Sequence, residues 1–575
     1  MIDLPQGGSG FVDSIRLPGA VEVAFVRSTI AHAEIDEVDV EEAREIPGVV
    51  GIWTAADLSP NTDLPAGHVD SPEGLMVDPP VRPLLAREQV RFVGEPVAVI
   101  AAENRYAAAD AAGMVIVEYE PLDSVASIGE ALSSDSATIH KDIGSNVVLD
   151  LEKPHGPAPP ATVRRAMSTW IQRRRAPAPA LPVVAAARWK EKELELWSSS
   201  SDPEATHAAV RAIFDVAEED FTFVHTGLPP SGSCTEVAPE VLVTAYIAQH
   251  LGRPATYTQS RSESLLAMPH VQAHEAELTV DFDDDGVIHS FDVNLVADSG
   301  AWPTVSSLDA VCETVRDVGA LYGIPAVGGR VRSVVTTTTP VSGSRATARA
   351  AGDTLVEAAL DLVATECSVD PVEIRRRNLD RASGSGDNET ALRGRALLDR
   401  CLAILADGEM SGAATDESRH RGLGIALRRG RNPEELAAEG CTVVVVPGRE
   451  VEVERACFVG PVSQRAAGDG LARGVTALGV ARAQYEEMRY DEDGQPQTST
   501  FVDYLVPSAA DSPPIDVAAT GPGGDPDSWA ASEAAAVSGV TAALTSHVAA
   551  GVRVPFSSEE LWRSYAGRSA EGLAP

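Results

Sequence analysis

The stretch PVAVIA at residues 96–101 decides how the first part of this chain folds. It is followed by NRYAAADAA at residues 104–112 and by VIVEY at residues 115–119. The first and third stretches are rich in β-branched residues, which favour strands. The middle stretch is rich in alanine, the best helix former, and Asn104 is a suitable N-cap. The order strand, helix, strand predicts an α+β unit.

Two more strands are expected upstream of this unit. Residues 21–26 (VEVAFV) and 48–53 (GVVGIW) have the β-branched and aromatic composition of strands. Residues 40–45 lie between them and predict a short helix that ends at a Pro-Gly pair. We therefore predict that residues 1–125 form one α+β domain.

The rest of the chain divides at proline-rich and polar stretches. Residues 154–182 contain repeated proline and alanine and two arginine clusters, at 164–165 and 173–175. We expect a linker and connecting segment over residues 126–182, and a basic binding arm at 154–182 is the alternative. Residues 183–406 and 421–575 carry alternating helix, strand and turn signals and would form two further units.

Composition and charge argue against several classes of protein. A chain of 575 residues exceeds the size of one hydrophobic core, and its 44% hydrophobic content is ordinary for a globular protein. The net charge of −39 disfavours nucleic-acid binding, because phosphates would be repelled. No run reaches the roughly 20 apolar residues of a membrane helix, and the start has no signal segment, so we expect a cytoplasmic protein. The six cysteines form no CxxC pair, which favours a reduced chain.

Several segments, spread in order over nearly the whole chain, resemble one protein family. They are AFVRS (24–28), IPGVV (46–50), VGEPVAV (93–99), GRP (252–254), RSE (261–263), DPVEIRRRNL (370–379), YDEDG (490–494) and TFVDY (500–504). The family comprises the molybdopterin-binding large subunits of the xanthine dehydrogenase, aldehyde oxidase and carbon monoxide dehydrogenase type. The resemblance implies an α+β fold. Its parts would be a hammerhead-like domain (1–125), a first molybdopterin-binding-like half (183–406) and a truncated second half (421–575).

The resemblance also implies a chemistry. Members of this family hydroxylate a carbon next to nitrogen or at an aldehyde, and electrons leave through iron–sulfur and flavin partners. The protein holds the pterin through backbone amides of glycine-rich loops, where the absence of a Cβ permits close approach. A buried glutamate acts as the base.

The segments that would hold the cofactor depart from the family's pattern. Residues 225–234 read HTGLPPSGSC, where prolines remove amide donors. Residues 343–351 (GSRATARAA) keep two arginines, Arg345 and Arg349, but lose both glycines of the family's second loop. A third loop would fall in a block that is missing between residues 427 and 441. We therefore predict that the chain holds no cofactor and no metal, and a chain that binds molybdopterin is the alternative.

Glu533, in contrast, favours a retained active site. Glu533, in the segment AASEAA at 530–535, aligns with the family's glutamate, and its small apolar neighbours would bury it. The alternative is an ordinary helix glutamate. We expect Glu533, Arg345 and Arg349 to meet at a mainly apolar pocket, where the arginines orient a carbonyl or enolate oxygen and the glutamate moves a proton. As the alternative, the arginines are structural ion-pair partners.

Taken together, these features favour a cofactor-independent enzyme of the cyclisation or isomerisation type, acting on a small biosynthetic intermediate. A divergent molybdopterin-dependent hydroxylase and a non-catalytic scaffold subunit are the alternatives. The expected partners are a small-molecule substrate and either a second copy of the chain or a paralogous subunit, with no nucleic acid and no membrane.

Two other motifs carry weaker signals. His270 and His274 have the spacing of metal ligands on a helix. However, residues 275–282 (EAELTVDF) alternate as a strand does, which would separate the two histidines by about 13 Å. The acidic run DDDG at 283–286 predicts a hairpin turn rather than a calcium loop.

Overall fold

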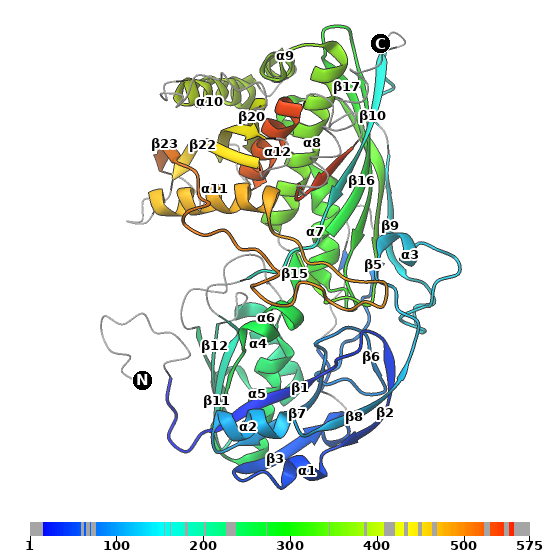
Figure 1. Ribbon diagram of the computed structural model, residues 1–575, viewed down its shortest axis with the longest axis vertical. Coiled ribbons are helices and arrows are strands. Elements are labelled where there is room, and N and C mark those ends of the chain that lie inside the picture. The colour runs from blue at the N-terminus through cyan, green and yellow to red at the C-terminus, as the bar shows by residue number, and fades with distance from the viewer. Residues whose placement is uncertain are drawn as a thin grey trace.

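The chain, seen in a computed structural model, has two lobes along its long axis (Figure 1). The structure describes residues 15–556 except 59–61, 65–68, 71–75, 155, 161–162, 179–181, 200–202, 226–236, 272, 344, 385–387, 407–419, 430–434, 447–450, 463–467, 523–529 and 545–550. Within these ranges no helix has both the length and the apolar character needed to cross a membrane.

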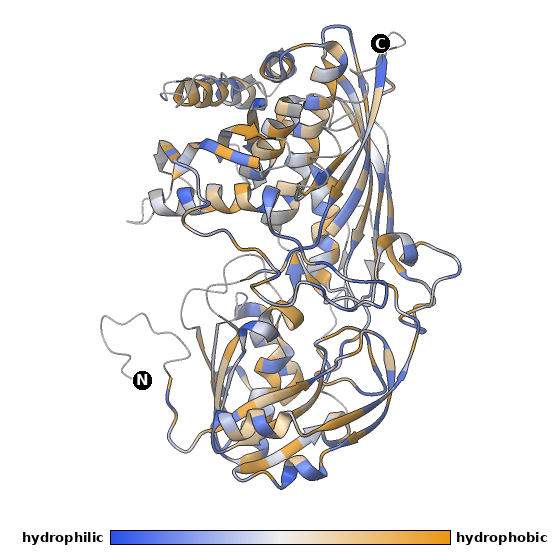
Figure 2. Cartoon of the chain, viewed as in Figure 1, coloured by the Kyte–Doolittle hydropathy of each residue, from blue (hydrophilic) through white to orange (hydrophobic). Residues whose placement is uncertain are grey.

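A seven-stranded sheet forms the small lobe at the bottom of Figure 1. Its strand order is β13 (Phe221–His225), β12 (Glu193–Ser198), β11 (Val184–Lys190), β14 (Ala255–Thr258), β1 (Val21–Arg27), β7 (Pro96–Ala102) and β3 (Val49–Thr54). Helix α5 (Pro239–Leu251) packs against β11 and β14, and α2 (Arg105–Ala112) packs against β1 and β7. Figure 2 shows β3 and β7 as largely hydrophobic above the hydrophilic helix α1 (Glu41–Arg44).

The predicted α+β character is confirmed. The expected strands and helix around residues 96–119 are present as β7, α2 and β8 (Ile116–Pro121). The Asn104 side chain caps α2 by accepting the backbone N–H groups of Tyr106 and Ala107, both at 3.0 Å. Strand β8 pairs with β2 (Ala33–Asp39), which in turn pairs with β6 (Gln89–Val90) in a small separate sheet.

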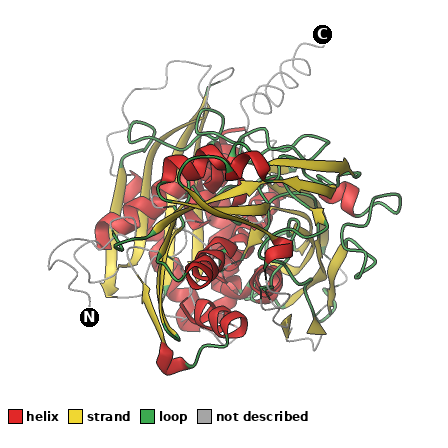
Figure 3. Ribbon diagram, turned by 90° about the horizontal axis from the view of Figure 1, so that it is seen from below, coloured by secondary structure: helices red, strands yellow, loops and turns green. Residues whose placement is uncertain are grey.

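A six-stranded sheet forms one side of the large lobe. Its order is β24 (Val552–Val554), β10 (Arg164–Gln172), β16 (Ala273–Phe282), β17 (Ile288–Asp298), β18 (Ala326–Val334) and β9 (Val147–Lys153). Against it pack α7 (Val305–Arg316) and α8 (Arg345–Cys367), and α9 (Pro371–Gly384) follows. Seen from below, the helices gather toward the middle of the molecule with strands on either side (Figure 3).

The second sheet of the large lobe has helices on both faces. It contains β20 (His420–Arg429), β21 (Leu436–Val445), β22 (Val451–Val462) and β23 (Ile515–Pro522). Side chains alternate between the faces of a strand. Position 424 of β20 faces α12 (Ala530–Leu544), and position 440 of β21, paired with residue 425, faces α10 (Asn388–Ala406). Helix α11 (Gly468–Gln484) lies beside α12.

Helix α12 lies deep in the large lobe and makes backbone contact with β20. A Cβ at Gly424 would lie 1.8 Å from the Ala535 carbonyl oxygen, and one at Gly422 would lie 1.9 Å from the Gly539 oxygen. Any larger residue at these positions would push the helix away. The two glycines therefore fix how closely α12 packs against β20 along residues 535–543.

Two predicted boundaries differ from the structure. Residues 126–182 are not a linker, because they contain α3 (Ile128–Ala131) and the sheet strands β9 and β10. The first arginine cluster lies on β10, where Arg165 pairs with Asp281 at 2.7 Å. The unit expected at 183–406 is also divided, since β11 to β14 belong to the sheet of the small lobe.

We predict that Gly424→Ala lowers the unfolding free energy by roughly 1–3 kcal/mol or more, as overpacked cores do. Denaturant unfolding measures the change. Gly470→Ala is the control, because a Cβ there meets no atom within 4 Å and alanine favours a helix. Equal stability of Gly424→Ala and the wild type would contradict the close approach of α12 to β20.

Candidate functional site

A buried ion pair marks the start of α12. Glu533 lies in the first turn and is 2% exposed. Its Oε2 atom accepts a hydrogen bond from Nη1 of Arg175 at 2.8 Å. Arg175, equally buried, follows β10 and forms an isolated bridge with Val271. Charges buried this deeply persist only when paired, so each side chain holds the other in place.

A second buried pair lies next to the first. Arg482 of α11 and Glu486, one turn later, approach to 3.7 Å, and the Tyr504 hydroxyl lies 3.3 Å from Glu486. Burial, together with repulsion from Arg175, lowers the pKa of Arg482 to about 10. Burial raises the pKa of Glu486, and attraction to Arg482 opposes this rise. Two arginines and two glutamates thus share one desolvated cluster.

The Oε1 atom of Glu533 has unused hydrogen-bonding capacity. It is buried and has no hydrogen-bond partner among the described residues. Buried polar atoms are nearly always paired in native proteins, so an unpaired one calls for an explanation such as a missing ligand or water. Arg175 holds Oε2, which leaves Oε1 as the atom that can receive a proton or a donor from a bound molecule.

A buried histidine borders this cluster on the sheet side. His274 of β16 lies opposite Gln172 of β10 in the strand register. Burial, with the Arg175 charge as a second cause, lowers the pKa of His274 to about 3, so its ring is neutral. Nε2 of His274 and Nε2 of Gln172 are buried without a hydrogen-bond partner in the described part of the chain. The cluster therefore contains several buried polar atoms that have no hydrogen-bond partner among the described residues.

The structure does not join the three predicted site residues in one contact. Glu533 pairs with Arg175, whereas Arg349 pairs with Glu313 of α7, with 2.7 Å between Nη2 and Oε1. Arg345 begins α8, and its side chain lies outside the described residues. Most of the predicted loop at 225–234 also lies outside them. The shared role of these three residues stays a prediction.

The two histidines considered as metal ligands lie on different strands. His274 is in β16, as the alternating pattern predicted, and His270 is in β15 (His270–Val271). Nε2 of His270 lies 2.8 Å from the Leu265 carbonyl oxygen. Among the described residues, no group of three His, Cys, Asp or Glu side chains gathers as metal ligands do. The predicted turn at 283–286 does connect β16 and β17 as an antiparallel hairpin.

Comparison with known proteins identifies the fold and the family. Residues 6–123 match the a/b hammerhead domain of aldehyde oxidase and xanthine dehydrogenase. Residues 163–379 and 335–513 each match a molybdopterin cofactor-binding domain. The chain belongs to the molybdenum hydroxylase large-subunit family. The hammerhead-like start and the molybdopterin-binding-type region that follows it are confirmed.

Individual relatives agree with this assignment. The chain is 29% identical to the nicotine 6-hydroxylase large subunit of Paenarthrobacter nicotinovorans, over 66% of this chain and 47% of that protein. It is 28% identical to the carbon monoxide dehydrogenase large chain of Afipia carboxidovorans, over 52% of this chain and 39% of that one. The chain thus spans about half the length of the curated relatives it matches. Quinoline 2-oxidoreductase from Pseudomonas putida 86 has the same fold, with a TM-score of 0.83, 20% identity and coverage of 97% and 96% of the two chains.

The prediction that this family member holds no cofactor is wrong. Its sequence matches molybdopterin cofactor-binding domains over residues 163–379 and 335–513, and its relatives include a xanthine dehydrogenase molybdenum-binding subunit from Escherichia coli. The prediction relied on changed side chains in three loops, although the resemblance implies binding through backbone amides, which many sequences can supply. The described residues fit such a group in one respect, because Glu533 presents a buried, unpartnered oxygen. Cofactor-independent cyclisation or isomerisation has no support from these comparisons.

The sequence did not identify two residues of the buried cluster around Glu533 as site residues. Arg175 belongs to the arginine cluster that was assigned to a linker, and Arg482 lies in an alanine-rich helix. Arg175 and Glu533 are 358 residues apart, so no local pattern connects them. The available signal was the clustering of three arginines next to a hydrophobic strand in a strongly acidic protein.

We predict that Arg175→Met lowers the unfolding free energy of the large lobe by about 3–5 kcal/mol, because it leaves the Glu533 charge buried and unpaired. The double variant Arg175→Met, Glu533→Leu should lose less unfolding free energy than Arg175→Met, since it removes both charges. Denaturant unfolding compares the two.

Arg330→Met is the control for this comparison. Its partner is Asp150, both side chains are largely exposed, and removing such a pair changes stability by about 0–1 kcal/mol. A double variant that is as unstable as Arg175→Met, or less stable, would show that the buried pair is not what holds this region together.

Proposed function

We propose that this chain is the catalytic large subunit of a molybdopterin-dependent oxidoreductase that hydroxylates a small organic molecule. The observation that carries the proposal is Glu533, which is buried, anchored through one oxygen by Arg175 and unpartnered at the other. In the sequence, residues 530–535 resemble the segment that carries the family's glutamate, and we infer that Glu533 has the same role. The matches to two molybdopterin-binding domains support the same proposal.

The reaction class converts a C–H bond and water into a C–OH group and releases two protons and two electrons. When bound, the cofactor supplies the two-electron redox chemistry. The protein must remove a proton next to it, and Glu533 Oε1 is the described atom best placed to accept that proton. Arg175 keeps the carboxylate from rotating because it holds Oε2 at 2.8 Å.

The surroundings of Glu533 suit this role. The site is desolvated, which strengthens electrostatic interactions with a bound molecule. His274 is neutral because of its lowered pKa, so it can donate or accept a hydrogen bond without adding charge. Arg345, at the start of α8, is the proposed partner for an oxygen of the substrate or an anionic group of the cofactor. The pairing of Arg349 with Glu313 favours a structural role for Arg349.

The electrons must leave to a redox partner, which we propose is a separate iron–sulfur or flavin subunit. The relatives support this assignment, because their names describe a large subunit, a large chain and a complex subunit gamma. For the substrate we propose a carbon next to nitrogen in a heteroaromatic ring, or an aldehyde. The relative named nicotine 6-hydroxylase favours the first of these.

We predict that Glu533→Gln leaves molybdenum bound but lowers kcat by about 10²-fold or more, because the amide cannot accept the proton. Dye reduction with a panel of N-heteroaromatic compounds and aldehydes measures turnover, and elemental analysis measures the metal. The protein is expressed with cofactor maturation proteins.

The matched control is Glu240→Gln. Glu240 is also a buried glutamate paired with an arginine, at 2.9 Å from Arg27, but it lies in the small lobe. The turnover of the Glu240→Gln variant should stay close to that of the wild type. Wild-type turnover in Glu533→Gln would exclude Glu533 as the base.

A further inference from the structure

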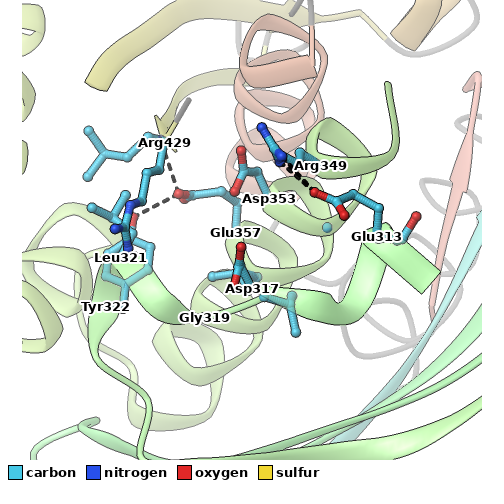
Figure 4. A pocket seen from close by; sticks show the side chains of 14 residues that line it. Glu313, Asp317, Gly319, Leu321, Tyr322, Arg349, Asp353, Glu357 and Arg429 are labelled. Carbon is cyan, nitrogen blue, oxygen red and sulfur yellow. Dashed lines mark hydrogen bonds and ion pairs between the residues drawn. The ribbon is translucent and has the colours of Figure 1, made fainter. Parts of the chain in front are cut away.

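Two cavities of the large lobe differ in chemical character. One lies among α7, α8 and the end of β20, and carboxylates line it (Figure 4). Glu313 pairs there with Arg349 at 2.7 Å, and Glu357 pairs with an arginine of α9 at 2.7 Å, so these charges are matched inside the fold. The other is an apolar groove on α11, with a volume of about 270 Å³. Apolar surface of this kind is stabilised when another molecule covers it.

The groove lies between one face of α11 and the connection from α11 to β23. Its walls are residues between 474 and 485 on the helix side and residues between 507 and 512 on the other side. A Cβ at Gly474 would meet no atom within 4 Å, so nothing described fills the space beside it. In Figure 1 the connection is the orange loop that leaves α11 and passes along the junction of the two lobes. It reaches the small lobe, where Gln495 Nε2 donates to the Thr29 carbonyl oxygen at 3.2 Å.

Exposed apolar side chains continue the groove along this connection. Phe501, Val502, Leu505 and Val506 are 47%, 85%, 53% and 47% exposed. No other stretch of six residues in the described part of the chain carries more than one large apolar side chain that is exposed to this extent. Scattered apolar residues on a surface are ordinary, whereas a continuous exposed patch marks a site of protein–protein contact. We call residues 501–512 together with the facing side of α11 the docking surface.

The docking surface is anchored to the buried cluster around Glu533. Tyr504 lies in the middle of the exposed stretch but is itself fully buried, and its hydroxyl lies 3.3 Å from Glu486 Oε2. Glu486 in turn approaches Arg482 of α11 to 3.7 Å, and Tyr485 between them lines the groove. Both walls of the groove therefore belong to segments that carry residues of the cluster. A partner that covers the groove would contact the segments that hold the candidate active site.

The charge around the docking surface selects the kind of partner. Among the described residues from 470 to 512, five exposed side chains are acidic and two are basic. They are Asp491, Glu492, Asp493, Asp503 and Asp511, against Arg473 and Arg489. A second copy of this chain, with a net charge of −39, would bring like charges together. A protein with an apolar centre and a basic rim would be complementary instead.

We propose that the docking surface binds the electron-accepting subunit, a redox protein whose apolar contact surface is surrounded by basic residues. The inference rests on the proposed function, because substrate oxidation leaves two electrons on the large subunit that an acceptor must remove. The iron–sulfur or flavin centre of the partner is reduced by these electrons. Docking at this place brings that centre to the side of the large lobe on which Tyr504, Glu486 and Arg482 connect the surface with Glu533.

Purification of the tagged full chain from its native host tests the proposal. Iron and flavin are measured per chain, and mass spectrometry identifies the subunit that carries them. The double variant Val502→Arg, Leu505→Arg should lower the bound iron or flavin about tenfold or more, because it removes apolar contact and places positive charge against a basic rim. Both side chains are exposed, so the fold should be unaffected, and thermal unfolding checks this.

Met167→Arg is the matched control. Met167 is also a large apolar residue, 64% exposed, but it lies on β10 and outside the docking surface. This variant should keep the iron or flavin content of the wild type. Neutralising the acidic rim with Asp503→Asn and Asp511→Asn should weaken the complex, and added salt should weaken the wild-type complex in the same direction.

Molybdenum content and single-turnover product formation separate this inference from the proposed function, since neither needs an electron acceptor. Both should be equal in the wild type and in Val502→Arg, Leu505→Arg. A wild type without molybdenum and without product would contradict the proposed function, and the inference would fall with it. With both present, the inference alone is overturned by equal iron or flavin in the double variant and the wild type, or by equal loss in Met167→Arg. It is also overturned if the wild type carries no such partner, or if light scattering shows a second copy of the chain that only the double variant loses.

Discussion

The close contact between the backbones of α12 and β20 is the constraint on which the rest of the large lobe depends. Gly422 and Gly424 have no side chains to separate the two elements, so the backbone of α12 packs directly against the backbone of β20. Its alanine-rich sequence suits that position, because small residues let α8 and α11 pack around it. Once the helix is buried, the glutamate in its first turn is buried as well.

Burial of Glu533 in turn dictates what surrounds it. An isolated carboxylate in such a place would be very costly, so a cation must accompany it, and the chain supplies Arg175 from the end of β10. Arg482 and Glu486 extend the same arrangement. The cluster is balanced in charge but incomplete in hydrogen bonds, because Glu533 Oε1 has no described partner. This combination of a fixed position and an unused acceptor is what a proton-transfer site requires.

Local sequence signals predicted local structure well and distant contacts poorly. The strands and capped helix between residues 96 and 119 were predictable, because β-branched residues, alanine and Asn104 act within a few positions. Strand β10 was assigned to a linker, because its arginines are paired by residues far away, such as Asp281. Glu533 was found only through resemblance to a family. Arg175 could not be connected with it, because the two residues meet only in the folded chain.

The error about the cofactor has a physical cause. Loops that bind through backbone amides leave a weak side-chain signature. Among the changed residues at 225–234 and 343–351, only Pro229 and Pro230 lack a backbone N–H, so the other substitutions leave the amides in place. The most direct test of cofactor binding beside Glu533 is an anomalous difference map, recorded at the molybdenum absorption edge from crystals of protein expressed with its maturation proteins. We expect one molybdenum peak per chain, next to the Glu533 carboxylate. An ordered large lobe with no peak, or with a peak away from Glu533, would contradict the account.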